Sequence, residues 1–432
     1  MTQKYPDDII RLREQIEEKS GKTPEQLYKE REKRLQDAME LKQPDRIPMH
    51  LMLGYFIADI GGITNQEMHE NPAKVQEILE HFALEHEADS ITGAYSSYAE
   101  HHIMLGDRMT AWPGHQLGPD GQFQFVEREF MKAEDYDEFL EDPVDWSIRT
   151  YLPRAFTALE SFSTLPPLGM TLFGCYHLFS VAQYANPALI EAFQKIAKAA
   201  QLTADRAKLT MEHGQRMVAL GFPPNVLTGA LLEAPYDFMS DTLRGMRGIM
   251  LDMLKRPDKL LVAQEKVTHF ELKSVLATGM KQALLPLHRG SDGFMSLNQF
   301  EKFYWPQLKG LMLQLIDNGI RPGCFYEGVW DERLEYLTEL PKGKTFGMFQ
   351  ASDIFKVKEV LGDTMCIIGG MPNSLIQSGT VQEVRDYTNK LCQEVGKDGG
   401  FIMSTGVGEM SGAKPELVKA WVDATLEYGS YS

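Results

Sequence analysis

The C-terminal third of the chain alternates short apolar runs with helix-like segments, and this order constrains the fold more than any other feature. The runs cover 322–327, 345–349, 365–369 and 401–404, and polar or glycine residues follow them. Such a β-helix-β order is typical of a parallel α/β fold, in which the strands deliver their last residues to one edge of the sheet. We therefore expect the chemistry of the protein at that edge.

Four earlier runs complete a set of eight predicted strands. They cover 47–53, 88–92, 168–173 and 283–288. Eight strands separated by helices predict an α/β fold of the (β/α)8 TIM-barrel type, in which reactive groups lie at the C-terminal ends of the strands. The segment 186–280 has a helical pattern almost throughout, so we expect a long helical insertion after the third strand.

The N-terminal residues 1–45 predict a helical extension ahead of the barrel. Thr23-Pro24-Glu25-Gln26 combines an N-cap, a first-turn proline and a capping-box glutamine. Since no clear linker follows, 46–432 is expected to form one barrel domain. Within it, Gly118-Pro119-Asp120-Gly121 precedes an alternating apolar segment, which predicts a hairpin that decorates the rim of the barrel.

Composition narrows the classes of partner. The 44 basic and 61 acidic residues give a formal net charge of −17, spread along the chain, which disfavours nucleic acid and anionic membranes as partners. No apolar stretch approaches the roughly 18 residues of a membrane span. The four cysteines show no paired spacing, which fits a reducing compartment. We expect a cytoplasmic protein.

Three polar residues at or just after the ends of predicted strands are the candidates for catalysis. Glu327 and His288 end neighbouring strands, close enough to share a ligand, a proton or a metal. The alternatives are a structural salt bridge from Glu327 to Arg289 or Arg333, and a hydrogen-bonded structural histidine. Asp353 could hold a substrate group or cap the helix that follows it.

A second set of residues is predicted to line the mouth of the barrel and bind a substrate. Aromatic side chains would suit an aromatic ligand, and a glycine turn at 369–370 would let a ligand approach the backbone. A carboxylate inside a buried strand needs a partner, which can be structural. The set is His50, Asp89, Tyr176, His177, Phe325, Tyr326, Trp330, Phe349 and Gly370.

Several short segments together resemble the uroporphyrinogen decarboxylase superfamily, which also includes cobalamin-linked methyltransferases. The resemblance extends over about 45–430 and is firmest in the last 110 residues or so. The segments that carry it are Asp45-Arg46-Ile47-Pro48, Ala88-Asp89, Ile368-Gly369-Gly370-Met371-Pro372, Ser378 to Val384, Gly399 to Gly406, and Lys414-Pro415-Glu416.

Two departures from the superfamily shape what the resemblance implies. The decarboxylases carry arginine after the first strand to neutralise substrate propionates, but 54–62 contains none, which argues against porphyrinogen decarboxylation. The thiol methyltransferases bind zinc through His-x-Cys-Gly and a later cysteine. The corresponding positions of this chain look like Phe325-Tyr326-Glu327-Gly328 and Val407, so all three zinc ligands are replaced. Glu327 thus stands at a cysteine position and offers a harder oxygen ligand.

The resemblance therefore implies a methyltransferase like those of anaerobic O-demethylase systems. Such an enzyme moves a methyl group from a small, aromatic O-methyl donor to the cobalt of a corrinoid (cobalamin) carried by a partner protein. The metal is left open: zinc held by Glu327 and His288 is one alternative, and direct acid catalysis is the other. A homodimer is the family expectation. A decarboxylase or lyase of a small aromatic or carboxylic acid, and a non-catalytic ligand-binding barrel, are the competing hypotheses.

Overall fold

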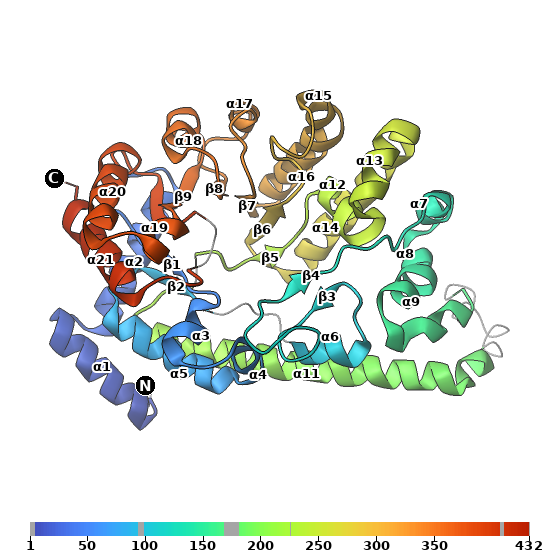
Figure 1. Cartoon of the computed structure of the whole chain (residues 1–432), viewed down its shortest axis with the longest axis horizontal. Coiled ribbons are helices and arrows are strands. Elements are labelled where there is room, and N and C mark those ends of the chain that lie inside the picture. The colour runs from blue at the N-terminus through green and yellow to red at the C-terminus, as the bar shows by residue number, and fades with distance from the viewer. Residues whose placement is uncertain (1–4, 94–98, 168–180, 225, 407–409, 432) are drawn as a thin grey trace.

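The computed structural model describes residues 5–93, 99–167, 181–224, 226–406 and 410–431. Its centre is a parallel sheet surrounded by helices (Figure 1). Six strands follow one another in the order β10 (Phe401–Thr405), β9 (Cys366–Met371), β8 (Phe346–Phe349), β7 (Arg321–Tyr326), β6 (Gln282–Leu287) and β5 (Ala230–Leu231).

Two more strands extend this order beyond β10. The parallel strands β1 (His50–Met52) and β2 (Ser90–Thr92) pair with each other, and a parallel bridge joins Met49 to Met403 beside β10. The eight strands therefore run in the order expected for a TIM-type barrel. At the two ends of this order, Val226 N donates to Ser90 Oγ at 3.2 Å, but no ladder joins β5 to β2 in the described part of the chain.

The segment 186–280 is helical almost throughout, as predicted, but one short strand, β5, interrupts it. This segment otherwise consists of helices, and the predicted third strand at 168–173 lies outside the described residues. With two residues, β5 is too short to stand out as an apolar run in the sequence. The helices of this segment are α11 (Pro187–Ala219), α12 (Pro235–Asp237), η5 (Phe238–Arg244, a π-helix), α13 (Gly245–Lys255) and α14 (Pro257–Thr278).

The remaining elements are helices and the two strands of the hairpin. Before β5 they are α1 (Asp7–Ser20), α2 (Pro24–Met39), α3 (Phe56–Gly61), α4 (Asn65–Glu70), α5 (Pro72–Glu85), α6 (Ala99–Leu105), β3 (Thr110–Ala111), β4 (Gln124–Phe125), η1 (Ala133–Asp135), α7 (Tyr136–Glu141), α8 (Pro143–Trp146), η2 (Ser147–Tyr151), α9 (Leu152–Ala155) and η3 (Thr157–Thr164). After β6 they are α15 (Leu297–Gln299), η6 (Phe300–Tyr304), α16 (Trp305–Asp317), α17 (Leu334–Leu337), α18 (Ile354–Leu361), α19 (Asn373–Ser378), α20 (Val381–Glu394) and α21 (Pro415–Tyr428).

Local signals in the sequence set several of these boundaries. The capping box at Thr23 forms as predicted, and Ser296 and Thr380 form two more, each with the hydroxyl accepting from the backbone N–H three residues on. The predicted hairpin is also confirmed, since β3 and β4 pair antiparallel. None of the described helices combines the length and hydropathy that a membrane crossing requires.

The N-terminal helix α2 is part of the core of the sheet. Its residues Leu35, Ala38 and Met39 pack with the inward-facing side chains of β8, β9 and β10. Met403, one residue on from an inward-facing one, belongs instead to the larger cluster that the sheet forms with its outer helices. This alternation along each strand assigns every side chain near the strand ends to one face.

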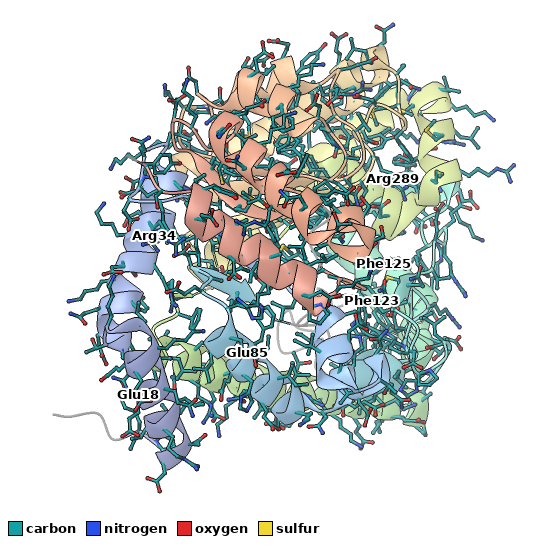
Figure 2. All side chains as sticks on the ribbon, turned by 60° about the vertical axis from the view of Figure 1, so that its left-hand side comes forward. Glu18, Arg34, Glu85, Phe123, Phe125 and Arg289 are labelled. Atoms are coloured by element: carbon teal, nitrogen blue, oxygen red, sulfur yellow. The ribbon has the colours of Figure 1, made fainter. Side chains whose placement is uncertain are left out.

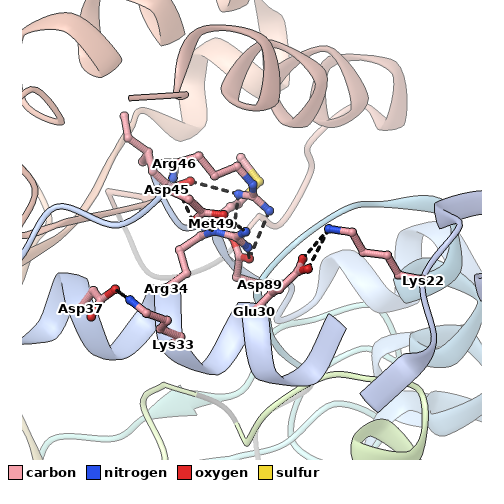
Figure 3. Close-up of polar contacts among 10 residues, drawn as sticks. Lys22, Glu30, Lys33, Arg34, Asp37, Asp45, Arg46, Met49 and Asp89 are labelled. Carbon is pink, nitrogen blue, oxygen red and sulfur yellow. Dashed lines mark hydrogen bonds and ion pairs between the residues drawn. The ribbon is translucent and has the colours of Figure 1, made fainter. Parts of the chain in front are cut away.

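A buried ion network ties α2 to β1 and β2 (Figure 3). The fully buried carboxylate of Asp89 pairs with Arg34 of α2 and accepts from Arg46 Nη1 at 2.8 Å and from Met49 N at 2.9 Å. Arg34 also donates to Asp45 at 2.7 Å. Asp89 therefore lies at the N-terminal end of β2. The predicted substrate site lies at the opposite, C-terminal ends of the strands.

Candidate active site

His288 and Glu327 lie side by side where β6 and β7 end. Because Leu287 and Tyr326 are partners in the ladder between these strands, the next residues on each strand are neighbours. The distance from His288 Nε2 to Glu327 Oε1 is 3.5 Å, and the two side chains are 31% and 38% exposed. The pair is therefore close enough to share a proton and open enough to meet a substrate.

The helix η5 supplies the group that orients His288. Asp241 accepts from His288 Nδ1 at 2.6 Å and from Arg289 Nε at 2.7 Å. This contact leaves His288 Nε2 directed at Glu327. It also engages Arg289, which we had considered as a salt-bridge partner of Glu327, while Arg333 pairs with Asp292 at 2.8 Å.

Asp237 fixes the backbone beneath the pair. This fully buried carboxyl accepts from His288 N at 2.9 Å, from Arg289 N at 3.1 Å and from the hydroxyl of Tyr304 at 2.7 Å. Burial and the nearby charge of Asp241 raise the pKa of Asp237 to about 7. Three donors on one carboxyl anchor the backbone at the end of β6 to α12.

The protonation of the pair follows from these contacts. Burial by itself would lower the pKa of His288, but the hydrogen bond to Asp241 and the charges of Asp237 and Glu327 outweigh it and raise the pKa to about 9. Burial raises the pKa of Glu327, and the charge of His288 opposes part of that rise. Near neutral pH the imidazole is therefore protonated, beside a carboxyl that binds a proton more readily than an ordinary glutamate.

Two further carboxyls, those of Glu233 and Glu271, lie near the pair formed by His288 and Glu327. Glu233, after β5, accepts from Thr242 Oγ1 at 3.3 Å, and its backbone N–H donates to Glu271 of α14 at 3.4 Å. Burial, then the charges of Asp241 and Asp237, raise the pKa of Glu233 to about 7, and burial raises that of Glu271 to about 7. The site is thus rich in carboxyls, and an anionic substrate group would meet repulsion there.

The predicted hairpin flanks this site. Figure 2 shows Arg289 on the same side of the molecule as Phe123 and Phe125. Just past β4, a carboxylate oxygen of Glu127 lies 4.0 Å from Arg289 Nη2. The Phe123 ring stacks on Trp112 at 5.4 Å. The aromatic side chains of the hairpin therefore lie near the C-terminal ends of the strands.

Three of the aromatic residues predicted to bind a substrate face the outer helices instead. Tyr326 stacks on Phe349 at 4.5 Å, and Trp330 packs edge-on against Tyr326 at 5.0 Å. All three are at most 2% exposed and belong to the outer cluster. Phe325, one residue before Tyr326, packs with the inner cluster. The prediction grouped residues near strand ends without separating the two faces that alternate along a strand.

The other predicted residues have different surroundings. His50 lies buried between Ser90 Oγ at 3.0 Å and Thr92 Oγ1 at 3.1 Å, and burial lowers its pKa to about 3, so it stays neutral. Asp353 is exposed and caps α18 by accepting from the backbone N–H of Phe355. Gly370, with φ of +104°, adopts a conformation that favours glycine. Tyr176 and His177 lie outside the described residues.

Sequence reasoning missed the residues that organise the pair. Asp237, Asp241 and Tyr304 lie in helical segments far along the chain from Glu327. The spacing of four between Asp237 and Asp241, which places both carboxyls on one face of a helix, was the available signal. It does not reveal which strand that face meets.

The described residues do not fit a zinc site. Glu327 and His288 supply two donor atoms, whereas catalytic zinc takes three protein ligands. Among the described residues, no group of three or more His, Cys, Asp or Glu side chains is placed to hold a metal ion. The three described cysteines, Cys324, Cys366 and Cys392, are buried.

Comparison with known proteins identifies the family to which the chain belongs. Residues 176–428, more than half of the chain, match the sequence model described as Uroporphyrinogen decarboxylase (URO-D). The chain belongs to this family. Among solved structures, a methyltransferase from Methanosarcina mazei is similar over 91% of this chain and 98% of its own, with a TM-score of 0.57 and 15% sequence identity. At that identity the likeness shows the fold. No curated protein matches the sequence significantly.

Proposed function

We propose that this URO-D protein is a methyltransferase that takes a methyl group from a small, aromatic O-methyl donor. The methyl acceptor is the cobalt of a corrinoid carried by a partner protein. The observation that carries the proposal is the protonated His288 held beside the half-buried carboxyl of Glu327 at the ends of β6 and β7. The family and the similar fold of the Methanosarcina mazei methyltransferase support it.

The pair supplies what breaking a methyl ether requires. When the bond between the methyl carbon and oxygen breaks, its electron pair stays on the oxygen, which leaves poorly unless it gains a proton. His288 Nε2 carries a proton at neutral pH, and Glu327 is placed to accept that proton or to pass it on. A bound corrinoid would supply the nucleophile, reduced cobalt, that takes the methyl group.

Asp241 and Asp237 act through His288. Asp241 keeps the imidazole charged and directs Nε2 toward Glu327, and Asp237 holds the backbone of His288. Once the leaving oxygen has taken the proton, the neutral imidazole regains one from solvent, since both side chains of the pair are partly exposed. This sequence of proton transfers requires no metal ligand from the chain.

The charge around the site favours this reaction over decarboxylation. Arg289 pairs with Asp241 and is not free for a substrate carboxylate, and the charge of His288 is balanced by Asp241 and Glu327 on its two sides. Glu233 and Glu327 add further carboxyls nearby. An uncharged ether therefore fits the site better than an aromatic acid.

Methyl transfer to reduced cobalamin, followed by the change in its absorption spectrum, tests the proposal. Methoxybenzene and the three methoxyphenols serve as donors. We expect Glu327→Gln to lower the rate at least a hundredfold, and Glu332→Gln, the same change on an exposed side chain, to leave it unaltered. Absence of transfer from every donor, or full activity of Glu327→Gln, would refute the proposal. Release of CO2 from an aromatic acid without cobalamin would favour the decarboxylase.

A further inference from the structure

A row of charged side chains runs from the hairpin to the proposed proton donor. Its members alternate in charge near neutral pH, and in order they are Glu127, Arg289, Asp241, His288 and Glu327. Glu127 Oε2 lies 4.0 Å from Arg289 Nη2, which lies 2.6 Å from Asp241 Oδ1. Asp241 Oδ2 lies 2.6 Å from His288 Nδ1, and His288 Nε2 lies 3.5 Å from Glu327 Oε1. Each charge in the row therefore acts on the next one.

Asp241 is the member of the row that two cations share. Its Oδ1 accepts from Arg289 Nε at 2.7 Å, and its Oδ2 accepts from His288 Nδ1 at 2.6 Å. The two cations divide the charge of one carboxylate, and they also repel each other. Both effects make the proton of His288 easier to remove, so Arg289 opposes the stabilisation that Asp241 gives to the charged imidazole.

This opposition matters because the surroundings of His288 are rich in negative charge. The carboxyl groups that act on it are those of Asp237, Asp241, Glu233 and Glu327. Burial alone would lower the pKa of His288, yet the hydrogen bond to Asp241 and the nearby carboxylates raise it to about 9. A general acid works best when its pKa lies near the working pH. Arg289 is a cation that limits this rise.

Glu127 is fixed at the other end of the row. Its Oε1 accepts from Met246 N at 2.6 Å, in the first turn of α13. Its side chain is 46% exposed, whereas that of Arg289 is 20% exposed. The row thus extends from an open carboxylate just past β4 to the strand ends, on the side of the molecule where Figure 2 labels Arg289 and Phe125.

We propose that Arg289 is a positioning residue for the proton donor: it holds Asp241 Oδ1 and draws part of the carboxylate charge away from His288, which then releases its proton more readily. Glu127 acts in the opposite sense, because its carboxylate neutralises part of the guanidinium charge. This inference rests on the proposed function, in which His288 supplies a proton to the leaving oxygen.

Two pairs of variants separate this role from a structural one. Arg289→Gln removes the positive charge, whereas Arg289→Lys keeps it and loses the planar fork. Glu127→Gln removes a carboxylate beside Arg289. Glu129→Gln makes the same change on an exposed side chain two residues on, which pairs with Arg244 at 2.5 Å instead.

Titration of the histidine NMR signals in the full chain tests the proposal, with the His288 signal assigned by its loss in His288→Gln. In Arg289→Gln this signal should titrate on the order of one pH unit higher than in wild type, because a like charge on the shared carboxylate is gone. In Arg289→Lys it should titrate near the wild-type pH. In Glu127→Gln it should titrate roughly 0.3 pH units lower, since that carboxylate is exposed and screened, and in Glu129→Gln it should not change.

The signs of these changes decide the outcome. An unchanged or lower titration of His288 in Arg289→Gln, or an equal rise in Arg289→Lys, would overturn the proposal. If Arg289→Gln does not fold, Glu127→Gln still decides, because a change no different from that in Glu129→Gln contradicts the row.

The rate of methyl transfer gives a second readout. Arg289→Gln should lower kcat at neutral pH about threefold with KM unchanged, and Arg289→Lys should restore it, as expected for a weaker general acid. The NMR titration requires neither a methyl donor nor a corrinoid. Methyl transfer can therefore fail while the changes in titration persist, so the two proposals are refuted separately.

Discussion

Asp241 is predicted to determine the charge of His288, and Asp241→Asn tests this directly. The variant keeps an oxygen that can accept from His288 Nδ1 but removes the negative charge. The charges of Asp237 and Glu327 remain in this variant, so the pKa of His288 should fall from about 9 toward its ordinary value of 6.5.

The size of the effect follows from the raised pKa. Because the folded-state pKa of His288 lies above 6.5, this group stabilises the fold fully below pH 6.5, and that contribution is lost as the pH rises toward about 9. Between pH 7.5 and 9 the loss is at most about 2 kcal/mol, from about 1.36 kcal/mol per pH unit. The side chain is 31% exposed, so solvent screening reduces our expectation to about 1 kcal/mol.

Two measurements test this prediction. Urea unfolding at pH 7.5 and pH 9 gives the change in stability, and the histidine NMR signals over the same pH range give the pH at which His288 titrates. This window lies above about pH 7, near which Asp237 and Glu233 titrate. Wild type should lose about 1 kcal/mol more than Asp241→Asn. The control Asp353→Asn changes an exposed helix cap and should behave as wild type. The reasoning is wrong if the His288 signal titrates at the same pH in Asp241→Asn and wild type.

Two predictions concern the scaffold that positions the site. Asp89→Asn leaves Arg34 and Arg46 without their buried counterion and should lower the free energy of unfolding by about 3–5 kcal/mol in urea; a change below about 1 kcal/mol would show that the network contributes little. Gly323→Ala would place a methyl group 1.9 Å from the Phe346 ring and should lower the melting temperature by several degrees. An unaltered melting temperature would mean that this ring moves freely.

Much of the fold could be predicted because its signals are local. Capping residues such as Thr380 determine where helices begin, and the apolar runs predicted seven strands that the structure contains. The short strand β5 was missed because two residues make no pattern. His288 and Glu327 could be proposed from the sequence because a polar residue at the end of an apolar strand is visible there, and the structure places the two side chains 3.5 Å apart.

The orientation of side chains at the strand ends required the structure. Phe325 and Tyr326 are adjacent aromatic residues, yet one packs in the interior and the other against the outer helices. The aromatic residues near the strand ends predicted an aromatic mouth, whereas Phe349 and Trp330 pack in the outer core. Which face of a strand points inward depends on the register of the whole sheet.

The sequence by itself determined the order of strands and the two residues proposed to carry the proton. The tertiary structure decided their chemistry, because Asp237 and Asp241 come from a helical segment about 50 residues before His288 and meet it only through packing. Proton affinity depends on burial and on charges a few ångströms away. Those quantities arise from contacts between distant parts of the chain, which a linear pattern of residues does not contain.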